Sequence, residues 1–333
     1  MRTIRNFTAS NTARTKLLIP LFAVILLALT VCSLLVGKYP LSLSELWAGD
    51  AMQWRVFRTL RLSRTIVAVV GGFTLGAAGF VYQTVFRNPL ASPDIIGVSS
   101  GASAGAAAGI LFLGGAAEVT VSAFVGAIAA VAVALGLSML DRSGRKSTIV
   151  LAGIAVHSLA QTALMCLKLS ADPERELASI EYWIMGGLGG LSADRIGGNL
   201  VLCVICMAAL FALHRQTLLL SADEGEARML GVSVGRMRLL VLTAATLSVS
   251  AVVSLTGLIS FIGLLAPHGA RLMTKQNGLR TMLLSGILGA VLLCGADILA
   301  RSVGQTELPV SIFTSLLGAP MLVFLVMRRG RKE

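Results

Sequence analysis

Residues 17–36 read LLIPLFAVILLALTVCSLLV, an apolar run without a charged side chain. A helix needs about 20 such residues to cross the hydrocarbon core of a bilayer. Arg14 and Lys16 precede the run, as in a secretory signal peptide, but no small-residue cleavage site follows it. We therefore expect a retained first membrane helix rather than a cleaved leader.

The composition of the whole chain also predicts a membrane protein. Of its 333 residues, 56% are hydrophobic and only 13% are charged, and the mean hydropathy is +0.84. A soluble protein of this length would need far more polar surface. Further apolar runs predict membrane spans at 65–85, 95–113, 119–140, 149–169, 195–213, 239–256, 258–274, 281–300 and 310–327. We expect an all-α integral membrane protein, a bundle of about ten transmembrane helices, with residues 1–333 in one domain.

Basic residues predict how the chain is oriented. An even number of spans puts both termini on one side, and Lys and Arg mark the cytoplasmic side. The basic runs lie mostly on the side of the termini, so we expect a cytoplasmic N-terminal tail over 1–16, a loop over 221–238 and a C-terminal tail over 328–333. This topology accounts for the net charge of +12, so no nucleic-acid partner is expected.

Four arginines depart from this charge rule. They fall on the external side, immediately before the second predicted span, and are Arg55, Arg58, Arg61 and Arg64. Two explanations are open from the sequence alone. The side chains either snorkel to lipid headgroups or form a docking surface for an acidic partner.

The third predicted span carries a face of small residues. Glycine recurs there every four residues, at Gly97, Gly101, Gly105 and Gly109. Such a small-xxx-small pattern lets a neighbouring helix approach closely in a membrane. We therefore expect a helix-packing face, although a helix beside a wide pathway would use the same pattern.

No motif in the chain predicts catalysis. Residues 97–101 match G-x-S-x-G, but an esterase needs this serine on a strand-to-helix turn, and here Ser99 opens an apolar helix. No P-loop and no H-E-x-x-H motif occurs. Cys203 and Cys206 form a C-x-x-C without a second ligand pair, which predicts buried thiols. We expect no catalytic residue, no metal site and no cofactor in this chain.

Few ionisable residues fall within the predicted spans. Asp297 lies four residues before Arg301, a spacing that predicts an ion pair on one helix face. His157 lies in the middle of the fifth span, where it either packs or faces a pathway. A proton-coupled carrier would usually hold more buried acids and bases, so this scarcity counts against a secondary transporter.

The predicted cytoplasmic loop over 221–238 carries the signals of a short helix. Ser221 and Glu224 resemble a capping box, and Gly231 is a candidate C-cap. Acidic residues come before basic ones, as the helix macrodipole favours. We expect a helix near 222–230, which either contacts a partner or is a solvated connection.

Several motifs, taken in order, resemble the FecCD-type permeases of ABC importers for ferric siderophores, haem and cobalamin. The matching segments are 61–64 (RLSR), 87–98 (RNPLASPDIIGV), 151–153 (LAG), 183–186 (WIMG), 226–232 (EARMLGV), 261–271 (FIGLLAPHGAR), 297–301 (DILAR), 307–310 (ELPV) and 317–320 (LGAP). They cover nearly the whole chain, and their combination is specific. Two departures are Ser63, where the family has proline, and Leu258, where a proline is common.

The resemblance implies partners and site residues. The partners are a second permease subunit, two cytoplasmic ATPases that use ATP and Mg²⁺, and an external substrate-binding protein. The family's docking arginines correspond to Arg61, Arg64 and Arg301. Its ATPase-coupling segment corresponds to Glu226, Ala227, Leu230 and Gly231. Ser147 and Thr148 are candidates for a cytoplasmic gate, because they directly precede the segment 151–153.

The resemblance also implies a function. We expect a permease subunit without enzymatic activity of its own, in the bacterial plasma (inner) membrane. The expected cargo is an iron(III)–siderophore complex, because such systems are the commonest users of the family; cobalamin and haem are the alternatives. A secondary carrier without an ATPase is disfavoured by the sparse intramembrane charge and by the coupling segment.

Overall fold

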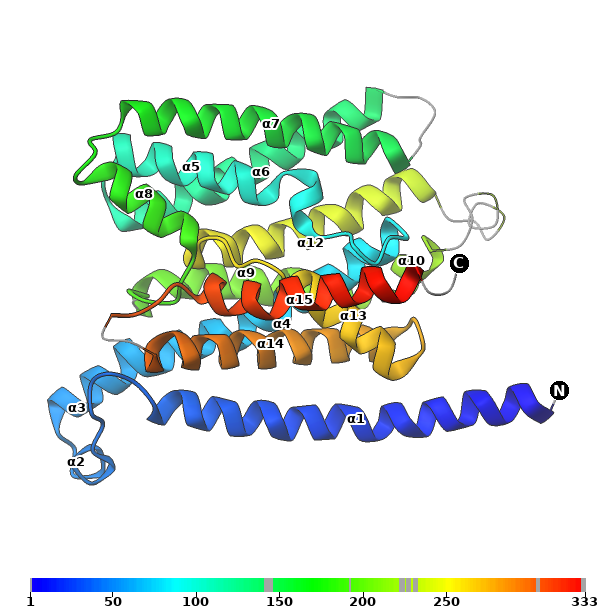
Figure 1. The fold of residues 1–333 in the computed structure, drawn as a ribbon, viewed down its shortest axis with the longest axis horizontal. Coiled ribbons are helices and arrows are strands. Elements are labelled where there is room, and N and C mark those ends of the chain that lie inside the picture. The colour runs from blue at the N-terminus through cyan, green and yellow to red at the C-terminus, as the bar shows by residue number, and fades with distance from the viewer. Residues whose placement is uncertain are drawn as a thin grey trace.

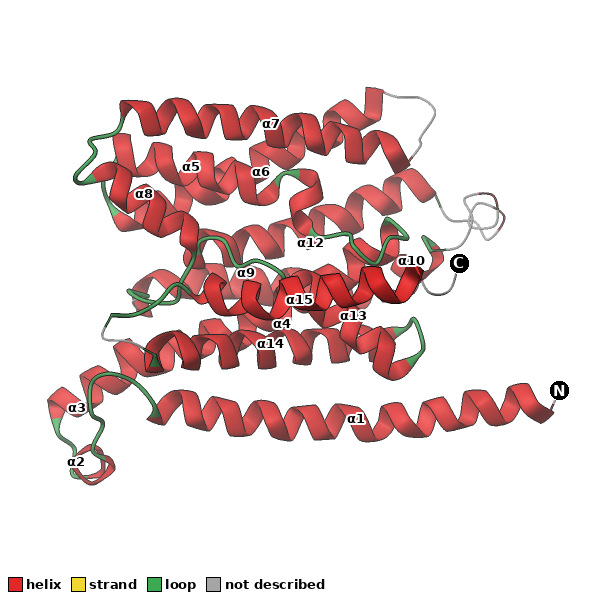
Figure 2. Cartoon of the chain, in the orientation of Figure 1, coloured by secondary structure: helices red, strands yellow, loops and turns green. Residues whose placement is uncertain are grey.

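The structure is a computed structural model that describes residues 2–140, 146–191, 193–221, 225, 229, 233–303 and 306–330. The described residues form helices, turns and loops and include no β-strand (Figure 2). Most helices run along one axis, and both termini lie at the same end of the bundle (Figure 1). The expected all-α bundle is therefore confirmed, while the cytoplasmic placement of the termini stays a prediction. We call the opposite end, on the left of Figure 1, the distal end.

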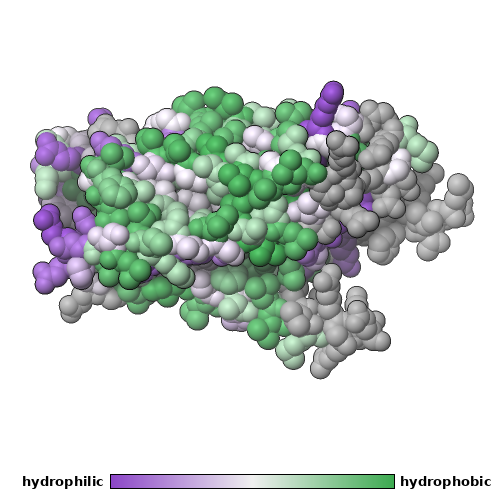
Figure 3. All heavy atoms as spheres, turned by 90° about the horizontal axis from the view of Figure 1, so that it is seen from above, coloured by the Kyte–Doolittle hydropathy of each residue, from purple (hydrophilic) through white to green (hydrophobic). Residues whose placement is uncertain are grey.

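Each of the predicted spans coincides with a helix in the described part of the chain. These helices are α1 (Arg2–Leu35), α4 (Ser63–Val85), α5 (Val98–Phe112), α6 (Ala116–Leu140), α7 (Lys146–Ser170), α9 (Ala193–Ala212), α12 (Val234–Thr256), α13 (Ile262–Thr274), α14 (Leu279–Ser302) and α15 (Val310–Gly330). Among the described residues, 6 helices are long and apolar enough to cross a membrane by length and composition. Apolar side chains cover the middle of the surface, and hydrophilic ones gather at the distal end (Figure 3).

The second span begins earlier than the sequence predicts. Short helices α2 (Leu43–Trp47) and α3 (Ala51–Val56) precede a π-helical segment η1 (Phe57–Leu62), which leads without interruption into α4. A proline at position 63 would remove a backbone N–H and clash with the preceding turn. Ser63 instead continues the helix, and its hydroxyl donates to the carbonyl of Arg58 at 3.0 Å.

Another helix at the distal end was not predicted. It is α8 (Glu176–Met185), between α7 and α9. Hydrogen bonds stabilise the turn before it: the side chain of Asp172 accepts from the backbone of Glu174 at 2.8 Å, and that of Glu176 accepts from the backbone of Asp172 at 3.0 Å. The N-cap residue itself, Arg175, makes no side-chain cap bond. Two further short elements in the described part of the chain are η2 (Pro93–Ile96) and α10 (His214–Leu219).

Glycines on α5 face α6. A Cβ at Gly105 would lie 2.2 Å from the backbone oxygen of Ser122, and one at Gly101 would lie 2.5 Å from that of Gly126. At such distances the two backbones touch without side chains between them. Gly109 also faces α6, whereas Gly97 precedes the helix with a φ of +85° and lies against α7.

A second close contact joins α4 and α14, and the sequence analysis missed it. A Cβ at Gly76 would lie 2.2 Å from the backbone oxygen of Ser285, and one at Gly289 would lie 2.1 Å from that of Gly72. The signal is the same small-xxx-small spacing, here between Gly72 and Gly76. α4 is the central helix of the bundle, with most of its residues buried.

A break in the helix separates the seventh and eighth spans, α12 and α13. Residues 257–261 are not helical, and Gly257 and Phe261 both have a φ of +67°. Two hydrogen bonds satisfy the backbone around this break. The N–H of Gly187 donates to Thr256 at 2.7 Å, and the hydroxyl of Ser311 donates to the carbonyl of Leu258 at 2.5 Å. Non-helical backbone is tolerated at this depth because protein groups supply its hydrogen-bond partners.

The contact between α5 and α6 generates a stability prediction. Gly105→Ala forces the two backbones apart, so we expect a loss of about 1–3 kcal/mol in the free energy of unfolding. Gly136 on α6 is the matched control, because a Cβ there meets nothing within 4 Å. Gly136→Ala is expected to change stability by less than about 1 kcal/mol, with a gain from helix propensity. Thermal unfolding of both variants in detergent would test this, and equal melting temperatures would contradict the packing argument.

Candidate functional site at the distal end

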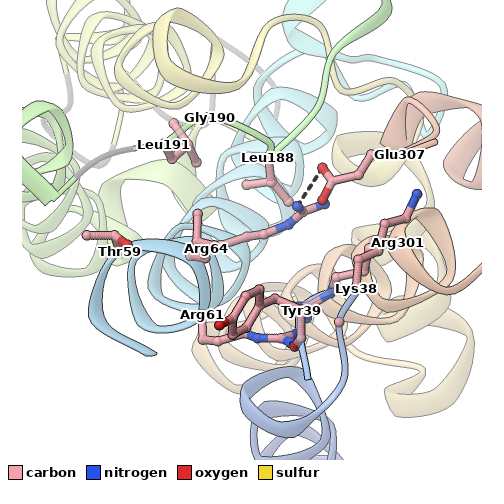
Figure 4. Close-up of a pocket in the computed structure, with 12 residues that line it drawn as sticks. Lys38, Tyr39, Thr59, Arg61, Arg64, Leu188, Gly190, Leu191, Arg301 and Glu307 are labelled. Carbon is pink, nitrogen blue, oxygen red and sulfur yellow. Dashed lines mark hydrogen bonds and ion pairs between the residues drawn. The ribbon is translucent and has the colours of Figure 1, made fainter. Parts of the chain in front are cut away.

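A cluster of charged side chains joins three parts of the chain at the distal end. Its members are Arg61, Arg64, Asp297, Arg301 and Glu307, and we call them the distal cluster. Figure 4 labels all of them except Asp297. The first two come from η1 and α4, the next two from α14, and Glu307 from the segment before α15. Residues far apart in the sequence thus meet where α4 begins and α14 ends.

Asp297 is the centre of this cluster. Its side chain is fully buried, and the Nε of Arg64 contacts its Oδ1 at 2.7 Å. The guanidinium of Arg301 lies 3.2 Å from Oδ2, which confirms the ion pair expected from the i,i+4 spacing. A buried carboxylate is tolerated only when it is paired, and here two guanidinium groups flank it.

Further contacts attach α1 and the segment before α15 to the cluster. The Nη1 of Arg64 lies 2.8 Å from the Oε2 of Glu307. Arg61 donates to the carbonyls of Val36 and Tyr39, just beyond the end of α1. Arg301 donates to the hydroxyl of Ser33 on α1 at 2.5 Å. The cluster therefore holds together the distal ends of three helices.

A small cavity of about 190 Å³ opens beside the distal cluster (Figure 4). Its polar lining includes Lys38, Arg61, Arg64, Arg301 and Glu307. The exposed fractions of Arg61, Arg64 and Arg301 are only 3%, 6% and 3%, whereas the side chain of Glu307 is 37% exposed. The structure thus gathers the three arginines of the docking hypothesis around one cavity, and it places most of their surface inside the protein. Their docking role stays a prediction.

The other predicted residues are dispersed. Ser147 and Thr148 belong to the first turn of α7, and Thr148 is half-buried. The coupling residues lie outside the described part of the chain; they are Glu226, Ala227, Leu230 and Gly231. Ser99 lies in the first turn of α5, and its hydroxyl donates to the carboxylate of Asp94 in η2. In the described residues, no group of three or more His, Cys, Asp and Glu side chains forms a candidate metal site.

Helix α7 exposes polar side chains in the middle of its span. His157, Ser158 and Thr162 are exposed, while Val156 and Leu164 are buried against the rest of the chain. His157 therefore does not pack in the interior of this subunit. Polar side chains at this depth rarely face lipid; they usually face a bundle interior or a water-filled cavity.

A larger cavity of about 740 Å³ lies between α5, α6, α8 and the distal end of α12. Its polar lining includes Glu174, Arg175, Ser179 and Tyr182 from α8 and the turn before it. The loop that carries Gly190 and Leu191 lines both this cavity and the small one beside the distal cluster. The two cavities are therefore neighbours.

Arg271 on α13 is a half-buried arginine to which the sequence analysis assigned no role. It donates to the side chain of Gln83, to the hydroxyl of Thr84 at 2.8 Å and to the carbonyl of Phe80 at 3.3 Å. Its guanidinium also lies 4.7 Å from the centre of the Phe80 ring. These partners all belong to the end of α4, and a cation is stabilised at a helix C-terminus. Arg271 thus attaches α13 to α4 at the end opposite the distal cluster.

Comparison with known proteins identifies the class first. A solved structure described as an inward-facing conformation of a metal-chelate type ABC transporter superposes with a TM-score of 0.84 and 30% sequence identity. The match covers 94% of this chain and 99% of that chain. The fold is therefore that of an ABC transporter permease. More specifically, the chain belongs to the FecCD transport family, whose profile matches residues 25–328.

Curated relatives agree with this assignment. The cobalamin import system permease protein of Halobacterium salinarum is 35% identical over 276 residues, which is 81% of this chain and 73% of that protein. The hemin transport system permease protein of Yersinia pestis is 33% identical and covers 96% of this chain and 97% of that protein. Other relatives are named for molybdate, iron(III)-citrate and siderophore systems. The expected resemblance is confirmed, and the chain is a multi-pass importer permease subunit.

The distal cluster generates a second stability prediction. Asp297→Asn leaves the buried guanidinium of Arg301 without a carboxylate and that of Arg64 with Glu307 alone, so we expect a loss of about 3–5 kcal/mol in the free energy of unfolding. Glu181→Gln is the control, because Glu181 pairs with Lys168 at 2.8 Å but is 46% exposed. That change is expected to cost less than about 1 kcal/mol. Unfolding of the two variants in detergent is the measurement, and similar losses would show that the cluster contributes little.

Proposed function

We propose that this chain moves an iron(III)–siderophore complex into the cytoplasm as the membrane-spanning subunit of a binding-protein-dependent ABC importer. The single observation that carries the transport role is the exposed polar face of α7, with His157, Ser158 and Thr162 at mid-span. The imidazole of His157 would be costly in hydrocarbon, whereas the hydroxyls of Ser158 and Thr162 donate to carbonyls of their own helix. We infer that a second permease subunit covers this face and that the two subunits enclose a water-filled pathway.

The proposed cargo rests on the range of the relatives. Their names include cobalamin, hemin, iron(III)-citrate and siderophore systems, most of which concern bulky metal complexes. A polar but uncharged stretch such as Ser158 and Thr162 suits a pathway that passes a large complex without binding it tightly. The cargo crosses without covalent change. Cobalamin and haem are the alternative cargoes of the same machinery.

The cavity beside the distal cluster supports a docking site for the external binding protein. Lys38 and three arginines line the cavity or its floor, against the two acids Asp297 and Glu307, so the site is positive. A volume of about 190 Å³ admits one carboxylate side chain from a partner. Electrostatic pairing of this kind sets the orientation and rate of association as well as the affinity.

The remaining parts of the proposal concern the opposite end of the bundle. Two cytoplasmic ATPases would bind the segment that contains Glu226, Ala227, Leu230 and Gly231 and would supply ATP hydrolysis. Closure of the ATPases would then move the helices that the segment connects. Ser147 and Thr148, at the start of α7, are the proposed gate of the pathway. The assembly would lie in the bacterial plasma membrane with both termini of this chain in the cytoplasm.

Uptake measurements test the cargo and the pathway together. Cells with and without this chain would receive labelled hydroxamate, catecholate and citrate complexes of iron, haem and cobalamin. We expect loss of one iron complex alone. In cells that carry Ser158→Cys, with the exposed cysteines Cys32 and Cys166 replaced by serine, a hydrophilic thiol reagent should then block uptake. Val133→Cys on α6 is the control, because Val133 is exposed on an apolar surface.

Each outcome of this experiment is informative. Loss of cobalamin or haem uptake would keep the machinery and replace the cargo. Loss of no compound, together with an unreactive Ser158→Cys protein, would contradict the proposal. Equal inhibition of the Ser158→Cys and Val133→Cys proteins would show that α7 has no special access to water.

The docking site generates a separate prediction. Glu307 holds Arg64 at the edge of the cavity and would compete with a partner's carboxylate. Glu307→Gln should therefore strengthen association with the binding protein that supports uptake, by roughly fivefold if a partly exposed ion pair contributes about 1 kcal/mol. Binding to the detergent-solubilised protein at low and high salt is the measurement. Glu118→Gln, which changes an acid outside this cavity, is the control. Unchanged association with the binding protein would mean that Arg61, Arg64 and Arg301 only stabilise the fold.

A further inference from the structure

The structure divides the four external arginines into two pairs. Arg61 and Arg64 belong to the distal cluster and are buried. Arg55 and Arg58 lie on α3 and η1 and are exposed. The second pair therefore needs an explanation of its own, because it takes no part in the ion pairs that hold the helices together.

Exposed apolar side chains surround this second pair. The exposed fractions are 94% for Trp47, 53% for Met52, 38% for Trp54 and 53% for Leu60. Two of the 3 tryptophans of the chain thus lie in the segment 43–60. The guanidinium of Arg58 lies 5.2 Å from the centre of the Trp54 ring, a cation–π distance.

Both acids of the same segment are exposed but accept hydrogen bonds within it. The carboxylate of Glu45 accepts from the side-chain amide of Gln53 at 2.8 Å, and that of Asp50 accepts from the backbone of Gln53 at 2.8 Å. Gln53 itself is 8% exposed. The surface of the segment therefore combines aromatic side chains with Arg55 and Arg58, while its two carboxylates already accept hydrogen bonds from Gln53.

The position of the segment indicates what this surface meets. Figure 1 shows α2 and α3 beside the distal end of α1, at the edge of the bundle rather than over its centre. The apolar span of α1 is only 6% buried within the chain, so α1 presents its surface to lipid. The donation from Arg61 to the carbonyl of Val36 keeps the end of η1 level with the end of α1. The end of the segment thus lies next to the end of the apolar run of α1.

We propose that the segment 43–60 is an interfacial anchor that binds anionic phospholipid at the membrane surface. Trp47 and Trp54 lie at the level of the headgroups, where tryptophan is enriched because its ring is apolar and its N–H is polar. Arg55 and Arg58 contact lipid phosphates, for which the planar guanidinium is well suited. This interaction is independent of the cargo and of the docking site on the distal cluster.

Tryptophan fluorescence tests the proposal. A protein that keeps only Trp47 (Trp54→Phe and Trp183→Phe) would be reconstituted into vesicles of phosphatidylcholine and phosphatidylglycerol with brominated acyl chains. We expect brominated lipid to quench Trp47 several-fold more than Trp183 in the matched protein that keeps only Trp183, because Trp183 packs against the core. Acrylamide in the water should quench Trp47 weakly. Strong quenching by acrylamide and none by brominated lipid would overturn the proposal in favour of a protein-docking surface.

The arginines are tested by lipid preference. In the Trp47 protein, brominated phosphatidylglycerol should quench more than brominated phosphatidylcholine when each is a minor component. Arg55→Gln and Arg58→Gln should each lower this preference on the order of fivefold, as expected for a basic side chain at an anionic surface. Arg175→Gln, an exposed arginine beside α8, should leave the preference unchanged. A preference that survives both substitutions would overturn the assignment of Arg55 and Arg58 to phosphate.

Discussion

Asp297 is a charge that has no access to water, and its neutralisation constrains the whole distal end. Leaving such a carboxylate unpaired would cost several kcal/mol, roughly the entire stability margin of a small domain. Arg64 and Arg301 lie on either side of it, so α4 and α14 can take only the rotation that aims both guanidinium groups at one carboxylate. Arg301 also reaches Ser33, which adds α1 to the same arrangement. The cavity beside the cluster is a result of this geometry.

Direct backbone contact is the second constraint, and it acts in the middle of the bundle. Lipid gives helices little reason to associate through apolar side chains, so close packing has to supply the attraction. Gly72 and Gly76 let α4 touch α14, and Gly101 and Gly105 let α5 touch α6. The ion pairs align the ends of α4 and α14, and the glycines set the distance between them. Both constraints meet in α4, the most buried helix.

The sequence predicts the spans well because an apolar run marks each membrane helix whatever its neighbours are, including α5 and α13, which are shorter than the hydrocarbon is thick. The pair of Asp297 and Arg301 was equally predictable, since helix geometry alone brings the two residues together. The contact of Asp297 with Arg64 was not, because it joins helices far apart in the sequence. The family motifs located the arginines but gave no sign that most of their surface is buried. The contact of α4 with α14 at Gly72 and Gly76 could also have been predicted, because the two glycines have the small-xxx-small spacing.

The continuity of α3, η1 and α4 has a mechanical consequence. A helix that runs unbroken from Ala51 to Val85 transmits a displacement along its axis. Helices in direct backbone contact, such as α4 and α14, have no side chains between them that could rearrange to absorb it. α14 should therefore travel with α4 as one rigid body, clamped at one end by the distal cluster and attached to α13 through Arg271 at the other. A displacement of the segment 43–60 should therefore be accompanied by a displacement of α13 at Arg271.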